Sequence, residues 1–226
     1  MGSDGRILIN PSILNANFDD LENEISKVSE VSDALHLDIM DNKFVPNFTF
    51  DFKRAMEIIG FSKLPVDAHL MIEDPDTIAP RYAQAGCASV SFHFEAAKNC
   101  RQTIADIKSN GAKVGIAIKP ATPLSVIEEF LDEIDMLLIM TVEPGFGGQT
   151  FMSDQMLKVS QARAKINSSK GEPVILQVDG GISITTIAAA SAGANCFVAG
   201  SAVYKDSNPA QIVTKLRELA KNSFKI

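Results

Sequence analysis

The chain has 226 residues, of which 46% are hydrophobic and 22% are charged, and its formal net charge at pH 7 is −7. This length and hydrophobic content suit one compact domain with a full core, and no change in composition marks a second domain. The acidic balance disfavours nucleic acid and anionic membranes as partners, because both attract basic surfaces.

The chain shows no targeting or membrane segment. No apolar run approaches the length needed to span a bilayer, and the first residues lack the charged-then-apolar pattern of a signal peptide. We therefore expect a soluble, cytoplasmic protein. Residues 1–5 are predicted to be a flexible end, and residues 6–226 to form the single domain.

The sequence contains three cysteines, Cys87, Cys100 and Cys196, and no C-x-x-C pair. An odd number without such a pair favours reduced thiols over a disulfide framework or a cysteine zinc site. We expect all three to be small core residues.

Eight short runs rich in β-branched residues recur at intervals typical of strand–helix units. In chain order, the predicted strands are Ile7–Leu14, Ala34–Asp38, Val66–Leu70, Ser89–His93, Val114–Ile118, Met136–Met140, Val174–Asp179 and Cys196–Ala199. Segments with helical spacing lie between them. One is predicted to begin behind a cap at Asp19, and another at Pro209.

Glycines mark several of the joints between predicted helices and strands. A helix often ends on a glycine in the left-handed conformation before the chain turns into the next strand. We predict this role for Gly60, Gly86, Gly111, Gly171 and Gly193.

Eight strand–helix units in a chain of this length predict a (β/α)8 TIM barrel. Parallel strands covered by helices either close at eight or remain an open, doubly wound sheet. The open sheet is the main alternative. It is disfavoured because no G-x-G-x-x-G follows an early strand.

The chemically active residues fall at predicted strand ends, where such a barrel places its active site. All three histidines, His36, His69 and His93, lie there, as do Asp38 and Asp179. Imidazole and carboxylate ligands suit zinc, iron or manganese, and a cation would compensate buried carboxylates. We predict His36, Asp38, His69 and Asp179 as metal ligands, with His93 outside that set.

Glycine-rich loops follow the last three predicted strands. In this fold such loops commonly bind phosphate through backbone N–H groups. The candidates are Gly145, Gly147, Gly148, Gly180, Gly181, Gly200 and Ser201. These segments contain no Lys or Arg, so backbone N–H groups and Ser201 would hold the phosphate. The alternative is that the glycines only make tight turns.

Seven phrases along the chain carry a family resemblance: PSILNANF from Pro11, HLDIMDNKFVPNFT from His36, DAHLM from Asp67, SFHFEA from Ser91, MTVEPGFGGQTF from Met140, VDGGI from Val178 and AGSAVY from Ala199. In order and spacing, the chain resembles the ribulose-phosphate 3-epimerase family over nearly its whole length. It departs from the family in the loop after the second strand, where many members have glycine in place of Asn42.

The resemblance implies a barrel enzyme of the pentose phosphate pathway that interconverts D-ribulose 5-phosphate and D-xylulose 5-phosphate. It implies one divalent metal ion, for which we expect Zn²⁺, with Fe²⁺, Mn²⁺ or Co²⁺ as alternatives, on the four ligands named above. By the family's motif, Asp38 and Asp179 are the acid/base pair, and Ser12 and His69 contact the sugar phosphate. Met40, Met71 and Met140 would line the pocket, although methionine is also an adaptable core filler. We also expect a homo-oligomer.

Epimerisation next to a ketone removes a proton from one face of a carbon and returns one to the other. Two carboxylates on opposite sides of the barrel could divide this work. The resulting ene-diolate is negatively charged, and a cation would stabilise it. Phe44–Asn47 and the loop around Phe146 are predicted lids that exclude water.

Other functions remain open from the sequence. Allulose 6-phosphate 3-epimerases share most of these motifs, and a sugar-phosphate sensor without activity could use the same pocket. A lyase or decarboxylase with D-x-K-x-x-D is disfavoured, because Met40 stands where that pattern needs lysine. A Schiff-base aldolase would need Lys119, which we predict to be a loop residue.

Overall fold

The computed structural model describes residues 6–169 and 171–224, so the predicted flexible end at residues 1–5 lies outside the described part. The described residues contain eight β-strands, and each overlaps one predicted strand. They are β1 (Leu8–Pro11), β2 (Leu35–Met40), β3 (Val66–Met71), β4 (Ser89–His93), β5 (Lys113–Ile118), β6 (Met136–Met140), β7 (Ile175–Asp179) and β8 (Cys196–Ala199).

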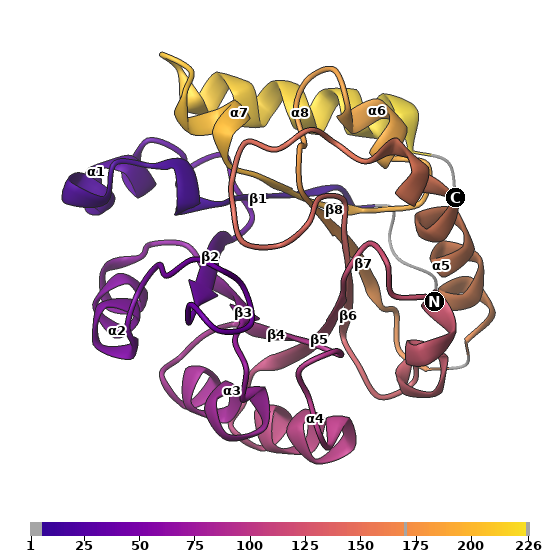
Figure 1. Ribbon diagram of the computed structural model, residues 1–226. Helices are drawn as coiled ribbons and strands as arrows, with labels where there is room; N and C mark the ends of the chain where they lie inside the picture. The colour runs from indigo at the N-terminus through magenta and orange to yellow at the C-terminus, as the bar shows by residue number, and fades with distance from the viewer. Residues whose placement is uncertain (1–5, 170, 225–226) are drawn as a thin grey trace.

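The strands form one parallel sheet in the order β1-β8-β7-β6-β5-β4-β3-β2. A parallel bridge between Ser12 and His36 brings the two ends of the sheet together. Figure 1 shows the resulting ring of strands with the helices outside it. Strands consecutive in sequence are neighbours in the ring, whereas a doubly wound sheet has its first strand inside the sheet. The predicted TIM barrel is confirmed.

The helices that cover the barrel are α1 (Leu21–Ser26), α2 (Phe52–Phe61), α3 (Pro75–Gln84), α4 (Cys100–Ser109), α5 (Met156–Ser168), α6 (Ile187–Ala190), α7 (Ser201–Tyr204) and α8 (Pro209–Ser223). Shorter turns of 3₁₀ helix are η1 (Ile13–Asn15), η2 (Phe18–Asp20), η3 (Leu124–Phe130) and η4 (Ser153–Gln155). Between β5 and β6, η3 takes the place of an α-helix. Among the described residues, no helix has both the length and the apolar composition needed to cross a lipid bilayer.

Two predicted boundaries near the N-terminus are wrong. The first strand ends at Pro11 because the Ser12 side chain accepts a hydrogen bond from the backbone N–H of Leu14, at 3.2 Å, and so caps η1. Asp19 does not cap α1. It lies inside η2, where its own N–H donates to the side chain of Asn17. The predicted start of the last helix at Pro209 is confirmed.

Of the five glycines predicted to be left-handed, only Gly86 and Gly111 are, with φ of +101° and +87°. Gly60 lies within α2. At Gly193 the reason for glycine is close approach, because a Cβ there would lie 2.9 Å from a backbone oxygen of α5. Asn42 has φ of 58°, a conformation open to glycine and, among other residues, most readily to asparagine. The family's glycine and this chain's asparagine therefore suit the same loop shape.

The strands turn an apolar face to the helices, and much of the face turned into the barrel is polar, because neighbouring side chains on a strand face opposite ways. On β2, Leu35, Leu37 and Ile39 belong to the main hydrophobic core cluster, whereas His36 and Asp38 pair with polar groups of other strands. The buried polar side chains on the strands include His36, Asp38, Asp67, His69, Ser91, His93 and Gln177, each at most 3% exposed. Burial of so many polar groups requires that they pair with one another or with a ligand.

Candidate metal and substrate site

Four of the predicted side chains meet inside the barrel, two from β2 and one each from β3 and β7. His36 is the second residue of β2, so the prediction that it lies at the strand end is wrong. One ligand atom from each of His36, Asp38, His69 and Asp179 can be chosen so that all four lie within 4.8 Å of one another. Asp38 Oδ1 is 3.5 Å from His36 Nε2 and 3.2 Å from His69 Nδ1. Asp179 Oδ2 is 3.9 Å and 3.6 Å from the same two nitrogens. Ligands of a tetrahedral zinc ion lie about 3.3 Å apart, so the spacing suits such a cation.

His36 is held so that one ring nitrogen faces this cluster. Its Nδ1 lies 3.0 Å from Asp67 Oδ2, and its Nε2 is buried without a hydrogen-bond partner. Three further side chains donate to the Asp67 carboxylate, those of Asn10, Gln177 and Ser89. A carboxylate so supplied with donors accepts the Nδ1–H of His36, which leaves a lone pair on Nε2. A divalent cation would satisfy that nitrogen.

The electrostatics of the cluster also favour a bound cation. Burial alone would raise the pKa of Asp38, but the imidazoles of His36 and His69 outweigh it and hold that pKa well below its usual range. Burial would lower the pKa of both histidines, yet the neighbouring carboxylates raise it. The buried carboxylates thus favour positive charge close to them. A divalent ion would supply it.

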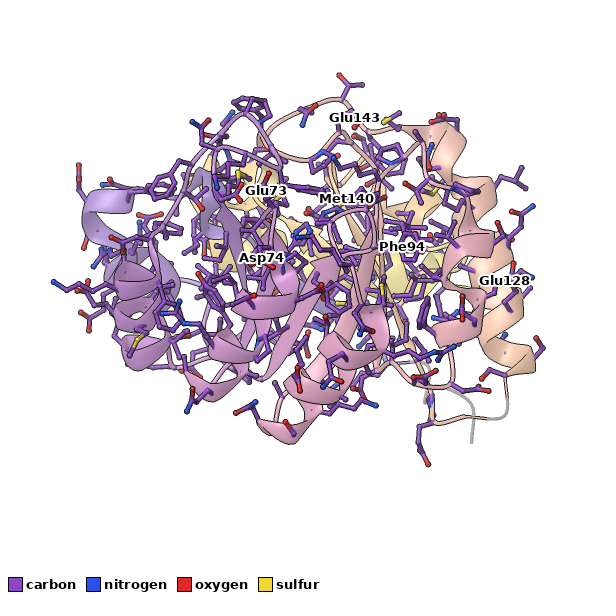
Figure 2. All side chains as sticks on the ribbon, turned by 60° about the horizontal axis from the view of Figure 1, so that its bottom comes forward. Glu73, Asp74, Phe94, Glu128, Met140 and Glu143 are labelled. Carbon is purple, nitrogen blue, oxygen red and sulfur yellow. The ribbon has the colours of Figure 1, made fainter. Side chains whose placement is uncertain are left out.

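A pocket of about 490 Å³, including open solvent at its mouth, lies above the cluster. Most of the predicted contact residues line it: Ser12, Asp38, Met40, Met71, Met140, Gly145, Gly147, Gly148, Asp179, Gly180, Gly181, Gly200 and Ser201. Ser12 Oγ donates to Asp38 Oδ2 at 2.5 Å. His36 and His69, both fully buried, are not among the lining residues. In Figure 2, Met140 lies below Glu143, which stands at the upper rim of the barrel.

The two predicted lid segments contact each other over this pocket. The side-chain amide of Asn47 donates to the carbonyl oxygen of Gly145 at 2.8 Å. Phe44 packs its ring on that of His93, with 4.8 Å between centroids, and the Nζ of Lys119 lies 3.8 Å from the Phe44 ring centre. Lys119 follows β5 as a loop residue, as predicted.

Two residues near the site were not predicted. Lys205 Nζ would lie 3.8 Å from a Cβ built on Gly148, beside Ser201. Ser201 begins α7 and Lys205 follows its last residue, and both side chains approach Gly148. Glu95, in the loop after β4, accepts from His93, and only the phrase SFHFEA hinted at it. Burial lowers the pKa of His93 to about 4, and hydrogen bonds lower that of Glu95 to about 2 against the effect of burial.

A family model described as the ribulose-phosphate 3 epimerase family matches residues 8–204 of the chain. The chain belongs to the ribulose-phosphate 3-epimerase family. Its relatives include the ribulose-phosphate 3-epimerase of Mycobacterium tuberculosis (strain H37Rv), 47% identical over 97% of this chain and 95% of the relative. The enzyme of that name from Escherichia coli (strain K12) is 40% identical over 96% of this chain and 97% of the relative. The family resemblance of the sequence is thereby confirmed.

Solved structures extend the likeness in fold beyond the family. A 3-hexulose-6-phosphate synthase from Salmonella typhimurium matches with a TM-score of 0.71 at 17% identity, over 96% of this chain and 100% of that one. KGPDC from Streptococcus mutans matches with a TM-score of 0.69 at 15% identity, over 97% and 100%. At these identities the likeness concerns the barrel alone.

Proposed function

We propose that this protein epimerises D-ribulose 5-phosphate at C3 to D-xylulose 5-phosphate. The observation that carries the proposal is the placement of Asp38 and Asp179. The two carboxylates come from β2 and β7 and line one pocket, together with glycines of the loops after β6, β7 and β8. Family membership and the names of the relatives support the same substrate.

The chemistry is a proton exchange at one carbon. One aspartate, as carboxylate, takes the C3 proton, and the electron pair left behind delocalises into the C2 carbonyl to give an ene-diolate. The other aspartate, as carboxylic acid, delivers a proton to the opposite face of C3. Each aspartate ends with the charge that the other had, and the reverse reaction exchanges their roles.

His36, Asp38, His69 and Asp179 would hold the divalent metal ion. The unpartnered Nε2 of His36 and the mixed nitrogen and oxygen donors support Zn²⁺, while Fe²⁺, Mn²⁺ and Co²⁺ accept the same ligands. When bound, the cation supplies positive charge that stabilises the oxygens of the ene-diolate. Ser12 would keep Asp38 in position by its hydrogen bond to Oδ2.

The rest of the pocket would bind and shield the substrate. The phosphate would lie against the N–H groups of the loops after β6, β7 and β8, with Ser201 and the ammonium of Lys205 beside it. The three methionines offer the intermediate an environment with few proton donors. The closed loops after β2 and β6 would exclude water during proton transfer.

Hydrogen exchange tests the proposal directly. We would incubate the protein with ribulose 5-phosphate in D₂O and follow the C3 proton by NMR, with allulose 6-phosphate in a parallel sample. Deuterium at C3 of the pentulose, entering faster than in the hexulose, is expected. Faster exchange in the hexulose would favour the hexulose epimerase, and no deuterium in either would favour the sensor without activity. The expected homo-oligomer and cytoplasmic location stay predictions.

A further inference from the structure

A buried series of hydrogen bonds runs from His69, on the side away from the cluster, through His93 to Glu95. His69 Nε2 lies 3.0 Å from His93 Nε2, and His93 Nδ1 lies 3.1 Å from Glu95 Oε2. Both imidazoles have no solvent-exposed surface. Neither ring can therefore exchange this partner for water.

We propose that Glu95, acting through His93, fixes which nitrogen of His69 carries a proton. Nδ1 of His69 is then left bare and directed at the metal ion. The inference rests on the metal site proposed above and adds two residues to it. Glu95 and His93 are positioning residues, since neither belongs to the ligand cluster or lines the pocket.

The carboxylate of Glu95 determines which group donates and which accepts in each of these hydrogen bonds. A carboxylate only accepts hydrogen bonds, so the contact with Oε2 requires a proton on His93 Nδ1. The neutral ring of His93 then has its lone pair on Nε2, which must accept from His69 Nε2–H. A neutral His69 with its proton on Nε2 has a free lone pair on Nδ1, the atom 3.2 Å from Asp38 Oδ1.

His36 achieves the same result by a shorter route. Its Nδ1 contacts the Asp67 carboxylate directly, so the free lone pair is on Nε2. The two histidines thus present opposite ring nitrogens to one cluster, and a carboxylate fixes each. For His69 that carboxylate is Glu95, which acts through the imidazole of His93. This accounts for His93 lying at a strand end without being a ligand.

Replacing Glu95 by glutamine should exchange donor and acceptor in each of these hydrogen bonds. Glu95 Oε1 accepts from the backbone N–H of Lys119 at 2.7 Å and from Thr122 Oγ1. A backbone N–H cannot become an acceptor, so the glutamine oxygen would take this position and the NH₂ group would face His93. His93 would then accept at Nδ1 and donate from Nε2, and His69 would have to carry its proton on Nδ1. That proton blocks the metal-binding lone pair.

The first test uses the wild-type protein loaded with Zn²⁺. Its three histidines can be resolved by ¹⁵N NMR through long-range couplings to the ring protons. We expect ring N–H protons on Nδ1 of His36, Nε2 of His69 and Nδ1 of His93. A proton on Nε2 of His93 would overturn the inference while leaving the metal site in place. Zn²⁺ that left the signals of His36 and His69 unchanged would overturn the metal site itself.

The second test compares metal affinity in folded variants by competition with a chelator. Glu95→Gln should lower Zn²⁺ affinity by about 10- to 100-fold, the usual effect of losing the group that orients a metal-binding histidine. Thr122→Val is the matched control, because it removes a donor to the same oxygen but leaves the Lys119 N–H in place. Its affinity should stay within about threefold of wild type. Equal affinities for Glu95→Gln and wild type would overturn the inference. If Glu95→Gln does not fold, the wild-type spectrum decides.

Discussion

The side-chain amide of Asn47 donates to the carbonyl oxygen of Gly145, which joins the loop after β2 to the loop after β6 above the pocket. The two loops also touch beside this bond, since a Cβ built on Gly145 would lie 3.2 Å from the Cβ of Val45. The structure therefore shows both predicted lids in contact with each other.

Asn47→Ala should weaken closure over the substrate. Loss of one hydrogen bond of about 1 kcal/mol should lower kcat/KM by roughly five- to tenfold. Steady-state kinetics would measure it. Phe48→Ala is the control in the same loop, because that side chain is 58% exposed. It should leave kcat/KM nearly unchanged. Wild-type kinetics in Asn47→Ala would show that the contact has no part in turnover.

Asp38→Asn and Asp179→Asn should each fold and lose turnover by about 10²- to 10⁴-fold, the usual contribution of a general acid or base. Asparagine keeps the shape of aspartate but cannot take up a proton at neutral pH. Because both residues are also proposed ligands, activity should be measured at saturating Zn²⁺ with the metal content determined. A fully loaded variant with near-native turnover would exclude that residue as acid or base.

The sequence was sufficient for the barrel and for the four clustered side chains, for one physical reason. Strand ends in a parallel barrel share one rim, so placing Asp38, His69 and Asp179 near strand ends also places them near one another. Contacts between loops carry no such periodic signal. Glu95 is tied to the site by a backbone N–H from another loop, and that partner depends on the folded chain. The prediction of left-handed glycines was partly wrong for a related reason. A glycine required by close approach and a glycine required by a left-handed φ cannot be told apart from the sequence alone.

Gly60 and Gly111 look alike in the sequence but should respond oppositely to alanine. Gly60 lies in α2 without positive φ and with open space around it, so Gly60→Ala should stabilise by roughly 0.5–1 kcal/mol. Gly111 has the same open space but φ of +87°, so Gly111→Ala should destabilise by about 1 kcal/mol. Urea unfolding of the metal-loaded proteins would compare them. Shifts of the same sign would contradict the assigned backbone conformations.

The cysteines should react slowly in the native protein. Burial raises the pKa of Cys87 to about 12, and it raises the pKa of Cys100 and Cys196 as well. A raised pKa means less thiolate at a given pH, and thiolate is the reactive form. The native protein would be treated with iodoacetamide at pH 8 and the labelled cysteines identified by mass spectrometry. The half-buried Cys100 should be labelled slowly, and its labelling should become faster as the pH rises. Cys87 and Cys196 should be protected. Protein unfolded in urea should label at all three. Rapid native labelling of Cys87 would contradict its burial.

Lys205→Gln should raise KM for the sugar phosphate and leave kcat unchanged. The ammonium lies beside Gly148 and Ser201, where the phosphate would bind, and this part of the substrate carries no reacting bond. Because Lys205 is exposed, solvent screens the interaction, and an increase in KM of about three- to tenfold is expected. The increase should shrink at high salt. Lys215→Gln, an exposed change on α8, is the control for net charge. Equal KM values for the two variants would show that the backbone N–H groups and Ser201 hold the phosphate unaided.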